Sequence, residues 1–226
     1  APAAATYAGD RPLSTVFNDE FRGGYVYTVG NSTYSGSIGP EGEYTVAFDP
    51  ELPADATVRY QRIYVYWAWS KLDQNAIYPV LSLTRTDTGE HLAEAGRYTD
   101  SKGFVSQNDF FSGMDIFTTG DLNPGKNSFT VVLKNNATDN RTFVVQGIGL
   151  LAVYESPGSP EAIAWVSEGA DLLYSSHGIT PVMASSRIDF PGTIDRSGLK
   201  SAELFIVAPS GGYTREKIPV INRLFF

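Results

Sequence analysis

The chain has 226 residues, of which 42% are hydrophobic, 13% aromatic and 19% charged, and this composition indicates a folded protein of one large or two smaller domains. Its formal net charge is −8 and its Lys and Arg residues form no cluster, which argues against a nucleic-acid binder because such proteins neutralise phosphates. Cysteine is absent, so disulfides, thiolate metal sites and cysteine nucleophiles are excluded.

The predicted elements are β-strands separated by turns. Runs rich in aromatic and β-branched residues, bounded by Gly, Pro, Asn and Asp, occur at residues 23–30, 42–49, 58–70, 76–86, 127–134, 141–155 and 200–210. The most helix-like segment, residues 161–174, contains Gly169 and β-branched residues, and we interpret it as two short strands. The sequence therefore predicts an all-β protein, an antiparallel and jelly-roll-like β-sandwich with little or no helix.

One predicted strand is apolar on both faces. Its two alternating sets are Ile63, Val65, Trp67 and Trp69 on one face and Tyr64, Tyr66 and Ala68 on the other. Such a strand lies at the centre of a covered sheet or at an interface. The four aromatic residues Tyr64, Tyr66, Trp67 and Trp69 are therefore candidates for subunit contacts or for a sugar-stacking platform, with core packing as the alternative. Residues 142–155 are likewise apolar on both faces, and Gly147 and Gly149 there permit a bulge or a close backbone approach.

Residues 121–127 predict a tight turn, within a segment that resembles a hairpin of sugar-binding jelly-roll sandwiches. Asp121, Asn123 and Asn127 offer oxygen ligands for calcium, but the full Asp-x-Asp-x-Asp-Gly loop is absent. The alternative is a plain turn, in which Asn and Asp bond to the local backbone. We expect no cofactor.

Three Asn-x-Ser/Thr triplets make Asn31, Asn136 and Asn140 candidate glycosylation sites. Two of them lie within five residues, in a segment that we expect to connect the two strands of a hairpin at residues 127–134 and 141–155. If this tip carries glycans it must face outward.

No motif identifies a chemical reaction, so we expect that the protein is not an enzyme. Ser176, His177 and Asp171 can be written as a triad, but triads are defined in space and no Gly-x-Ser-x-Gly elbow accompanies them. Carboxylates such as Asp115 and Glu168 are numerous, but a glycosidase needs two of them across a cleft, which a sequence does not reveal.

A weak internal repeat relates residues 44–70 to residues 185–211. The second copy is followed by far less sequence than the first. We therefore predict a complete sandwich at residues 1–155 and a partial second β domain, a truncated repeat, at residues 156–226. Its open strand edges require a partner, because an uncovered edge pairs with neighbouring strands.

Export is expected for this chain. It opens with Ala-Pro-Ala-Ala-Ala-Thr, small residues of the kind left after cleavage of a signal peptide. There is no run of 18 apolar residues, so we expect no transmembrane segment. Together with the three triplets, these features favour an extracellular location at the cell surface.

Five blocks together resemble an uncharacterised family of secreted domains that recurs in surface proteins of methanogenic archaea. They are residues 34–70, 120–135, 146–155, 167–180 and 201–212, and the most specific text in them is YVYWAWS and EGADLLYSSHG. The resemblance implies an exported β-sandwich of the cell envelope. Some members look like subunits of the proteinaceous sheath of methanogen filaments, which is thought to be a β-rich, amyloid-like assembly. The family has no established enzymatic motif.

The resulting hypothesis is a structural, self-assembling subunit of an archaeal cell-surface sheath or envelope layer. It would associate with itself, as a homo-polymer, through strand edges and aromatic faces. Other envelope proteins or glycans are further candidate partners. The alternative is a carbohydrate-binding or adhesin module, and a hydrolase is the third class.

Overall fold

The computed structural model describes residues 7–102, 111–120, 122–175, 178–209 and 211, and in these residues it contains β-strands and no helix. The chain divides into two compact units, Ala1–Pro191 and Gly192–Phe226. All strands found in the described residues, β1 to β14, belong to the first unit.

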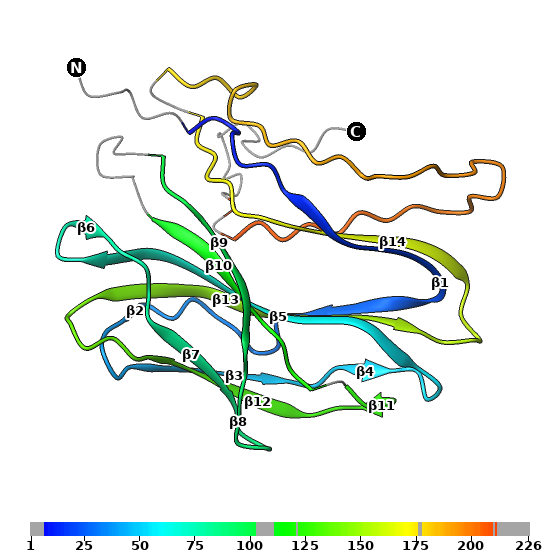
Figure 1. Cartoon of the computed structure of the whole chain (residues 1–226), viewed down its shortest axis with the longest axis horizontal. Helices are drawn as coiled ribbons and strands as arrows, with labels where there is room; N and C mark the ends of the chain where they lie inside the picture. Colours follow the sequence, from blue (N-terminus) through cyan, green and yellow to red (C-terminus); the bar gives the residue numbers. More distant parts are fainter. Residues whose placement is uncertain (1–6, 103–110, 121, 176–177, 210, 212–226) are drawn as a thin grey trace, which may run out of the picture. The chain divides into compact units, whose positions relative to one another are not determined.

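Two antiparallel sheets form the first unit (Figure 1). The large sheet has the order β14-β1-β13-β5-β10-β9, formed by β14 (Glu161–Glu168), β1 (Ser14–Thr28), β13 (Thr142–Glu155), β5 (Thr57–Leu72), β10 (Ser112–Phe117) and β9 (Glu94–Asp100), with β2 (Ser37–Ile38) on β13 and β6 (Asn75–Ala76) on β5. The small sheet has the order β3-β12-β7-β8, formed by β3 (Glu43–Phe48), β12 (Phe129–Asn135), β7 (Leu81–Arg85) and β8 (Glu90–His91). A separate pair joins β4 (Glu51–Leu52) to β11 (Gly125–Lys126). The predicted all-β, antiparallel sandwich is confirmed.

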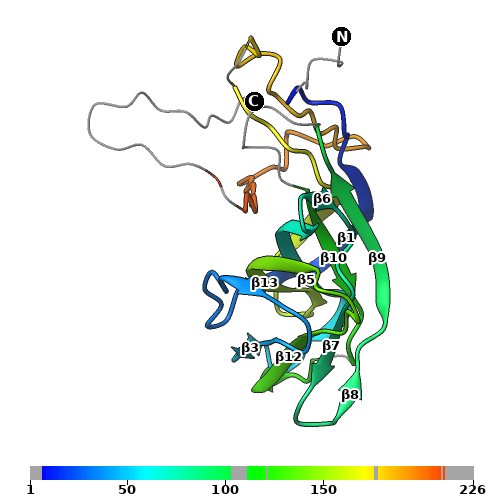
Figure 2. The ribbon, with the colours of Figure 1, turned by 90° about the vertical axis from the view of Figure 1, so that its left-hand side faces the viewer.

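The main core lies between the two sheets, which Figure 2 shows one above the other. The small sheet contributes alternate residues of β3 and β12, such as Phe48 and Leu133, and the large sheet contributes Ile63, Val65 and Trp67 of β5. These side chains are 1% exposed or less. Burial of apolar surface at this interface is the main force that holds the two sheets together.

The prediction of a central strand with two covered faces is confirmed for β5. It lies between β13 and β10, and residues 63–68 are buried without a break. Gly149 on the neighbouring strand β13 allows a close approach, because a Cβ there would lie 2.3 Å from the Tyr27 hydroxyl. The ladder between β13 and β5 shifts register between Val145 and Gly147, which is the expected bulge.

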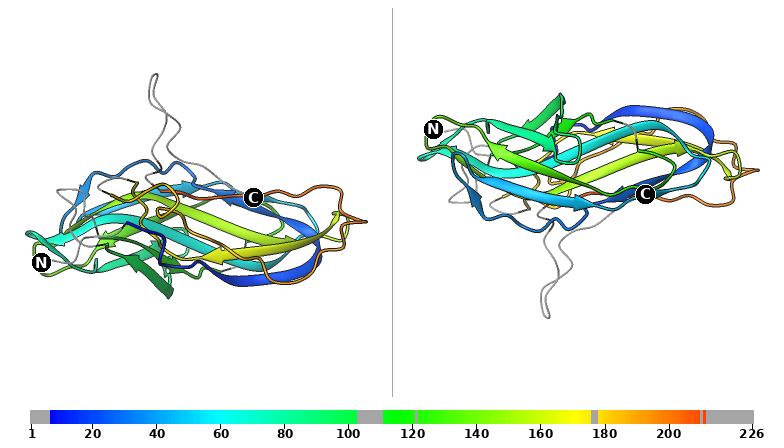
Figure 3. Two further views of the ribbon diagram at one scale, coloured as in Figure 1. Left: turned by 90° about the horizontal axis from the view of Figure 1, so that it is seen from above. Right: turned by 90° about the horizontal axis from the view of Figure 1, so that it is seen from below.

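A sharp bend in β1 adds a third layer. Residues 14–22 of β1 pair with β14, whereas residues 23–28 pair with β13. Gly23 lies at the bend, and a Cβ there would meet the carbonyl oxygen of Tyr154 at 1.9 Å. The first half of β1 and β14 thereby form a two-stranded ribbon over the face of the large sheet that the small sheet leaves open (Figures 1 and 3).

Two connections that the sequence suggested as hairpins cross between the sheets instead. β10 of the large sheet leads through residues 118–128 to β12 of the small sheet, and β12 leads through residues 136–141 back to β13 of the large sheet. Both connections occur at the positions predicted from their turn residues. Turn residues, however, do not indicate whether the two flanking strands pair with each other.

The chain after residue 155 departs from the expected pattern. Residues 161–168 form one strand of the large sheet rather than the start of a separate domain, and the division between the compact units falls after Pro191. The strand expected at residues 200–210 does not form in the described residues, where Phe205 and Ile206 are 52% and 49% exposed. A strand is defined by its ladder with a neighbouring strand, and no ladder in the described part of the chain includes residues 200–209.

Candidate functional site

A layer of tyrosines lies between the large sheet and the ribbon of β1 and β14. Tyr64 and Tyr66 of β5 have ring centroids 6.2 Å apart and are 4% and 9% exposed. The hydroxyls of Tyr60 and Tyr64 each donate a hydrogen bond of 2.8 Å to Glu168 Oε1 at the end of β14. The Tyr27 and Tyr66 hydroxyls lie 3.2 Å apart. The two bonds to Glu168 connect β14 of the ribbon to β5 of the large sheet.

Burial raises the pKa of Tyr64 well above its ordinary value, and the charge of Glu168 and its hydrogen bond raise it further. Burial likewise raises the pKa of Tyr66, with the neighbouring Tyr27 adding to the effect. The pKa of Tyr60 rises for the same reasons, burial first and Glu168 second. The layer therefore stays protonated in the folded protein at a pH where free tyrosine ionises.

The four candidate aromatic residues do not share one exposed surface. Tyr64 and Tyr66 face the ribbon, whereas Trp67 faces the core between the sheets at 1% exposure. Trp69 is 39% exposed and has a φ of 58°, at an irregular point of the ladder between β5 and β13. Core packing, the alternative for such residues, accounts for Tyr64, Tyr66 and Trp67.

Asp115 is a fully buried carboxylate with three bonds. Its Oδ1 accepts hydrogen bonds from Trp67 Nε1 at 2.8 Å and from Arg97 Nε at 2.7 Å, and its Oδ2 accepts one from Arg97 Nη2 at 2.5 Å. The pairing joins β5, β10 and β9 across the large sheet. Because both oxygens are paired, Asp115 is a structural residue rather than a free acid or base.

Three carboxylates, two of them buried, surround Lys102, whose side chain is 2% exposed. Lys102 Nζ lies 2.9 Å from Asp100 Oδ2 and 2.9 Å from Asp171 Oδ1, and it also contacts Asp10 Oδ1. We call Asp10, Asp100 and Asp171 the carboxylate cluster. Burial alone lowers the pKa of Lys102, but its hydrogen bonds to the three aspartates outweigh this and raise it.

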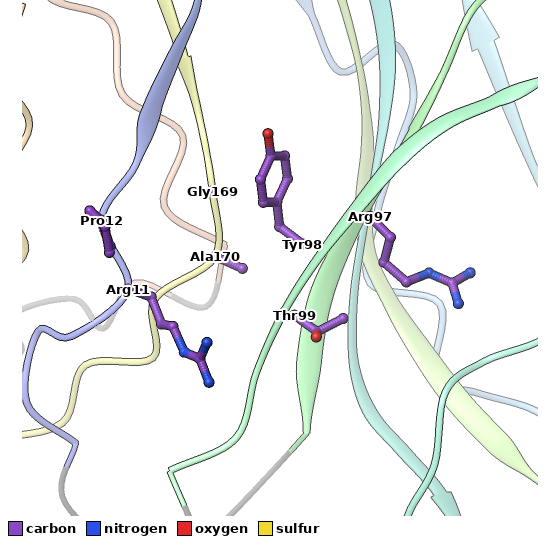
Figure 4. Close-up of a pocket in the computed structure, with 7 residues that line it drawn as sticks. All are labelled: Arg11, Pro12, Arg97, Tyr98, Thr99, Gly169 and Ala170. Atoms are coloured by element: carbon purple, nitrogen blue, oxygen red, sulfur yellow. The ribbon is translucent and has the colours of Figure 1, made fainter.

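A cavity of about 360 Å³ is lined by chain neighbours of the three aspartates, Arg11, Thr99 and Ala170 among them (Figure 4). It is lined by Arg11, Pro12, Arg97, Tyr98, Thr99, Gly169 and Ala170. Tyr98 stands on the side of β9 that faces Ala170, whereas the Arg97 side chain points away from Arg11 toward Asp115 (Figure 4). The cavity separates β9 from the segment that follows β14.

The two paired glycosylation triplets lie at the surface. Asn136 and Asn140 are exposed in the connection between β12 and β13, and Asn136 Nδ2 donates a bond of 2.7 Å to Ser82 Oγ. At the third triplet, the exposed Asn31 accepts a bond from Ala47 N at its Oδ1, and its own N–H donates to Ala47 O. The expected outward orientation of the tip is consistent with this exposure, and attachment of glycans stays a prediction.

The neighbouring Asn135, which no motif singled out, holds this connection in place. It is 0% exposed, its Nδ2 donates to Ile38 O and to Arg141 O, and its Oδ1 accepts from Ala137 N. These bonds satisfy backbone groups where the chain passes from one sheet to the other.

Replacing Asn135 with Ala is therefore expected to lower the free energy of unfolding by about 2–3 kcal/mol, because buried backbone groups lose their partners. Denaturant unfolding of unglycosylated protein measures the change. Asn140→Ala, an exposed asparagine in the same connection, serves as the control and should stay within about 0.5 kcal/mol of the parent. Equal effects of the two changes would contradict the structural role of Asn135.

The calcium candidate at residues 121–127 consists of a turn with local bonds. Asn127 Oδ1 accepts from Asn123 N, and Asn127 Nδ2 donates to Asn123 O and Gly125 O. These bonds engage the Asn127 amide in the manner of the plain-turn alternative. Asp121, the third member, lies outside the described residues.

Three of the residues considered for catalysis, Asp115, Glu168 and Asp171, lie in the described part of the chain, and each has other bonding partners. The chain's other histidine, His91, is exposed on β8, with its Nδ1 2.9 Å from Thr84 Oγ1. Asp171 belongs to the carboxylate cluster, while Ser176 and His177 lie outside the described residues. Asp115 and Glu168 are engaged with Arg97 and with two tyrosines, respectively.

Sequence reasoning missed the carboxylate cluster. Its members are 71 or more positions apart along the chain, and only the fold joins them. One weak signal was present, because Lys102 follows Asp100 by two residues and a lysine has to be paired if it is buried.

The fold and these clusters define a cysteine-free antiparallel β-sandwich with a third, tyrosine-lined layer. No helix long and apolar enough to span a membrane occurs among the residues that the structure describes. The chain belongs to the family described as Protein of unknown function (DUF3344), whose model matches residues 6–224. Neither the curated proteins nor the solved structures contain a match to the chain.

Proposed function

We propose that the protein is a self-assembling structural subunit of an archaeal cell-surface sheath or envelope layer, which pairs with copies of itself through open strand edges. The resemblance of its sequence blocks to sheath-type surface proteins suggests the setting. The observation that carries the proposal is the state of the two ends of the large sheet. There, β9 and β14 have no partner strand on their outer sides among the described residues.

The edge strand β14 has no charge or proline along residues 162–167, although its Trp165 packs against Phe190 and donates a hydrogen bond to Pro191 O. Monomeric proteins place charges, proline or bulges on such edges. Residues 162–167 of β14 are Ala-Ile-Ala-Trp-Val-Ser, which contains neither a charge nor a proline. Ile163 within it is 37% exposed. This edge favours the addition of a strand from a neighbouring subunit.

The small sheet has protected edges. Asn31 bonds to both backbone groups of Ala47 and so covers the outer side of β3 at that point. At the opposite end, β8 has only two residues, Glu90 and His91. The candidate glycosylation sites belong to the loops that border the small sheet and to its connection to β13. Glycans there would leave the ends of the large sheet open for association.

The alternative of a carbohydrate-binding module needs aromatic faces that are open to solvent. Tyr64, Tyr66 and Trp67 are buried by the fold, and among the four candidates Trp69 is the exposed one. We therefore prefer the structural proposal, in which edges rather than aromatic faces make the contact. It assigns no catalytic role to the chain.

Replacing Ile163 with Lys tests the edge. We expect the parent protein to form regular sheets, hoops or tubes in electron microscopy at high concentration, with a strand spacing of about 4.8 Å in diffraction. Ile163→Lys should reduce assembly at least about tenfold, since a lysine on an edge strand opposes the addition of a further strand. Its thermal stability should be unchanged because the side chain is already partly exposed.

Val132→Lys is the matched control. Val132 is a partly buried β-branched residue like Ile163, but it belongs to β12, which at this residue pairs with β3 on one side and β7 on the other. This variant should assemble like the parent. A parent protein that stays monomeric at high concentration, or a loss of assembly in both variants alike, would contradict association through β14.

A further inference from the structure

Lys102 and Asp171 are a buried amine and a buried carboxyl group that come from distant parts of the chain. Lys102 follows the end of β9 and Asp171 follows the end of β14, the two outer strands of the large sheet. Their side chains are 2% and 3% exposed, and Lys102 Nζ lies 2.9 Å from Asp171 Oδ1. The two groups therefore meet in a place from which bulk water is largely excluded.

The bonding of Asp171 is incomplete. Its Oδ1 accepts a hydrogen bond from Lys102 Nζ, whereas its Oδ2 is buried without a hydrogen-bond donor among the described residues. Such an oxygen is unfavourable on a charged group, because the carboxylate has lost its hydration without a full replacement. An amide in place of this ion pair would carry no charge and one oxygen fewer.

Asp100 lies beside the pair and is held by other partners as well. Its Oδ2 lies 2.9 Å from Lys102 Nζ and accepts a hydrogen bond of 2.7 Å from Leu172 N. Its Oδ1 lies 3.6 Å from Arg11 Nε. One of its oxygens is also within 4.8 Å of an oxygen of Asp171. Asp100 is therefore placed to exchange protons with the amine and with the second carboxyl group.

We propose that Lys102 and Asp171 join in an intramolecular isopeptide bond, an amide between the two side chains. Nζ attacks Cγ of Asp171, the N–C bond forms, and one of the two Cγ–Oδ bonds breaks. The ammonium ion has three protons, of which one stays on the amide nitrogen and two leave with the departing oxygen as water. One positive and one negative charge disappear together, so the reaction needs no oxidant or other reactant.

Asp100 provides the proton transfers that this reaction requires. Burial lowers the pKa of Lys102, but its hydrogen bonds to the aspartates outweigh this and raise it, so the reactant is the ammonium ion. An ammonium ion has no lone pair, and Asp100 Oδ2 therefore first accepts a proton from Nζ across their contact. Asp100 then gives this proton to the departing oxygen of Asp171. Because the two reacting groups are already in contact, the fold replaces a collision between separate molecules.

Asp10 is the less suitable acceptor, although it also contacts Lys102 Nζ. Its side chain is 57% exposed, so its carboxylate keeps its hydration and gains little from losing its charge. After the reaction Asp10 retains water as its partner, and Asp100 retains Arg11 and Leu172 N. The product thus leaves no buried charge of the cluster without an opposite charge nearby.

The bond would connect the end of β9 covalently to the segment after β14. It closes the chain between residues 102 and 171, which restricts the unfolded chain as a disulfide does. In a chain without cysteine such a bond takes the place of a disulfide. It does not depend on the proposed assembly.

Mass spectrometry of the intact full chain under denaturing conditions tests the bond. We expect the parent to be lighter than its sequence by the mass of one water molecule. Trypsin does not cleave after an amidated lysine, so digestion should give a branched peptide of residues 98–126 and 142–187. A parent mass equal to that of the sequence overturns the proposal. A lost water that maps within a single peptide, or to a bond between Lys102 and Asp10, overturns it as well.

Lys102→Arg keeps the positive charge but removes the reactive amine. This variant should have the full mass of its sequence, and it should migrate more slowly than the parent in a denaturing gel because its unfolded chain is not closed. Lys134→Arg is the matched control, since Lys134 Nζ also lies 2.6 Å from a carboxylate oxygen, Glu41 Oε2, but at 37% and 73% exposure. The control should lose one water like the parent. A loss of water in Lys102→Arg would overturn the proposal.

Asp100→Asn tests the proton transfer separately. The side-chain oxygen of asparagine still accepts a hydrogen bond from Leu172 N, but asparagine does not take a proton from the ammonium ion. In freshly synthesised protein the loss of water should be at least about tenfold slower than in the parent. An equal rate in Asp100→Asn and the parent would contradict the role of Asp100.

Discussion

Replacing Asp115 with Ala is expected to lower the free energy of unfolding by about 3–5 kcal/mol, the typical cost of removing one partner from a buried ion pair. Asp115 is 0% exposed, and its loss leaves both Trp67 Nε1 and the Arg97 guanidinium without their acceptor. Trp67 lies in the core between the sheets and Arg97 on the edge strand β9. The change therefore weakens the core and the end of the large sheet together.

Denaturant unfolding, followed by tryptophan fluorescence, measures the effect. The matched control is Asp87→Ala, which removes another bidentate partner of an arginine. Arg85 and Asp87 also bond at 2.8 Å, but the Asp87 side chain is 38% exposed. Asp87→Ala should lower the free energy of unfolding by at most about 1 kcal/mol. An equal decrease in the free energy of unfolding in the two variants would contradict a contribution of burial to the stability that Asp115 provides.

Above a pH of about 10, the protein is expected to lose stability steeply because of its tyrosine layer. The pKa values of Tyr64 and Tyr66 are raised in the folded state, so between the ordinary value and the raised one the unfolded chain has released protons that the folded chain retains. The stabilisation is fully present below a pH of about 10 and decreases as the pH rises, by about 1.4 kcal/mol per pH unit for each such tyrosine.

Unfolding midpoints in denaturant at several alkaline pH values test this slope, and near-ultraviolet absorbance reports tyrosinate formation in the same samples. Tyr66→Phe should reduce the slope by the share of one tyrosine, about 1.4 kcal/mol per pH unit. If Tyr66 ionised in the folded protein at its ordinary pKa, Tyr66→Phe would leave the slope unchanged, and the folded parent would form one tyrosinate more than the folded variant.

The pattern of residues along β5 was sufficient to predict its place in the fold. Apolar and aromatic residues on both faces from Ile63 to Ala68 are incompatible with a solvated surface, and the strand is indeed central. The bulge at Gly147 was also predicted, since glycine in a strand commonly marks such points, whereas the group that approaches Gly149 is the Tyr27 side chain rather than a backbone. These are local properties, which alternation and residue size determine.

The partners of the strands were not predictable in the same way. Residues 161–168 were assigned to a second domain, yet they pair with the first half of β1, more than 130 positions earlier in the chain. The connection at residues 136–141 contains good turn residues, but it passes between two sheets instead of closing a hairpin. Turn chemistry is short-range, whereas strand pairing is decided by burial over the whole domain.

The sequence by itself determined the class of this protein: an all-β, cysteine-free, acidic chain whose strands alternate or are apolar on both faces. Only the tertiary structure decided which polar groups meet. Asp115 finds Arg97 and Trp67, Glu168 finds two tyrosines, and Lys102 joins Asp10, Asp100 and Asp171. Hydrophobic periodicity is a local property, so it can be read from neighbouring positions in the sequence. A buried charge needs a partner within bonding distance, and which groups lie that close depends on the folded chain.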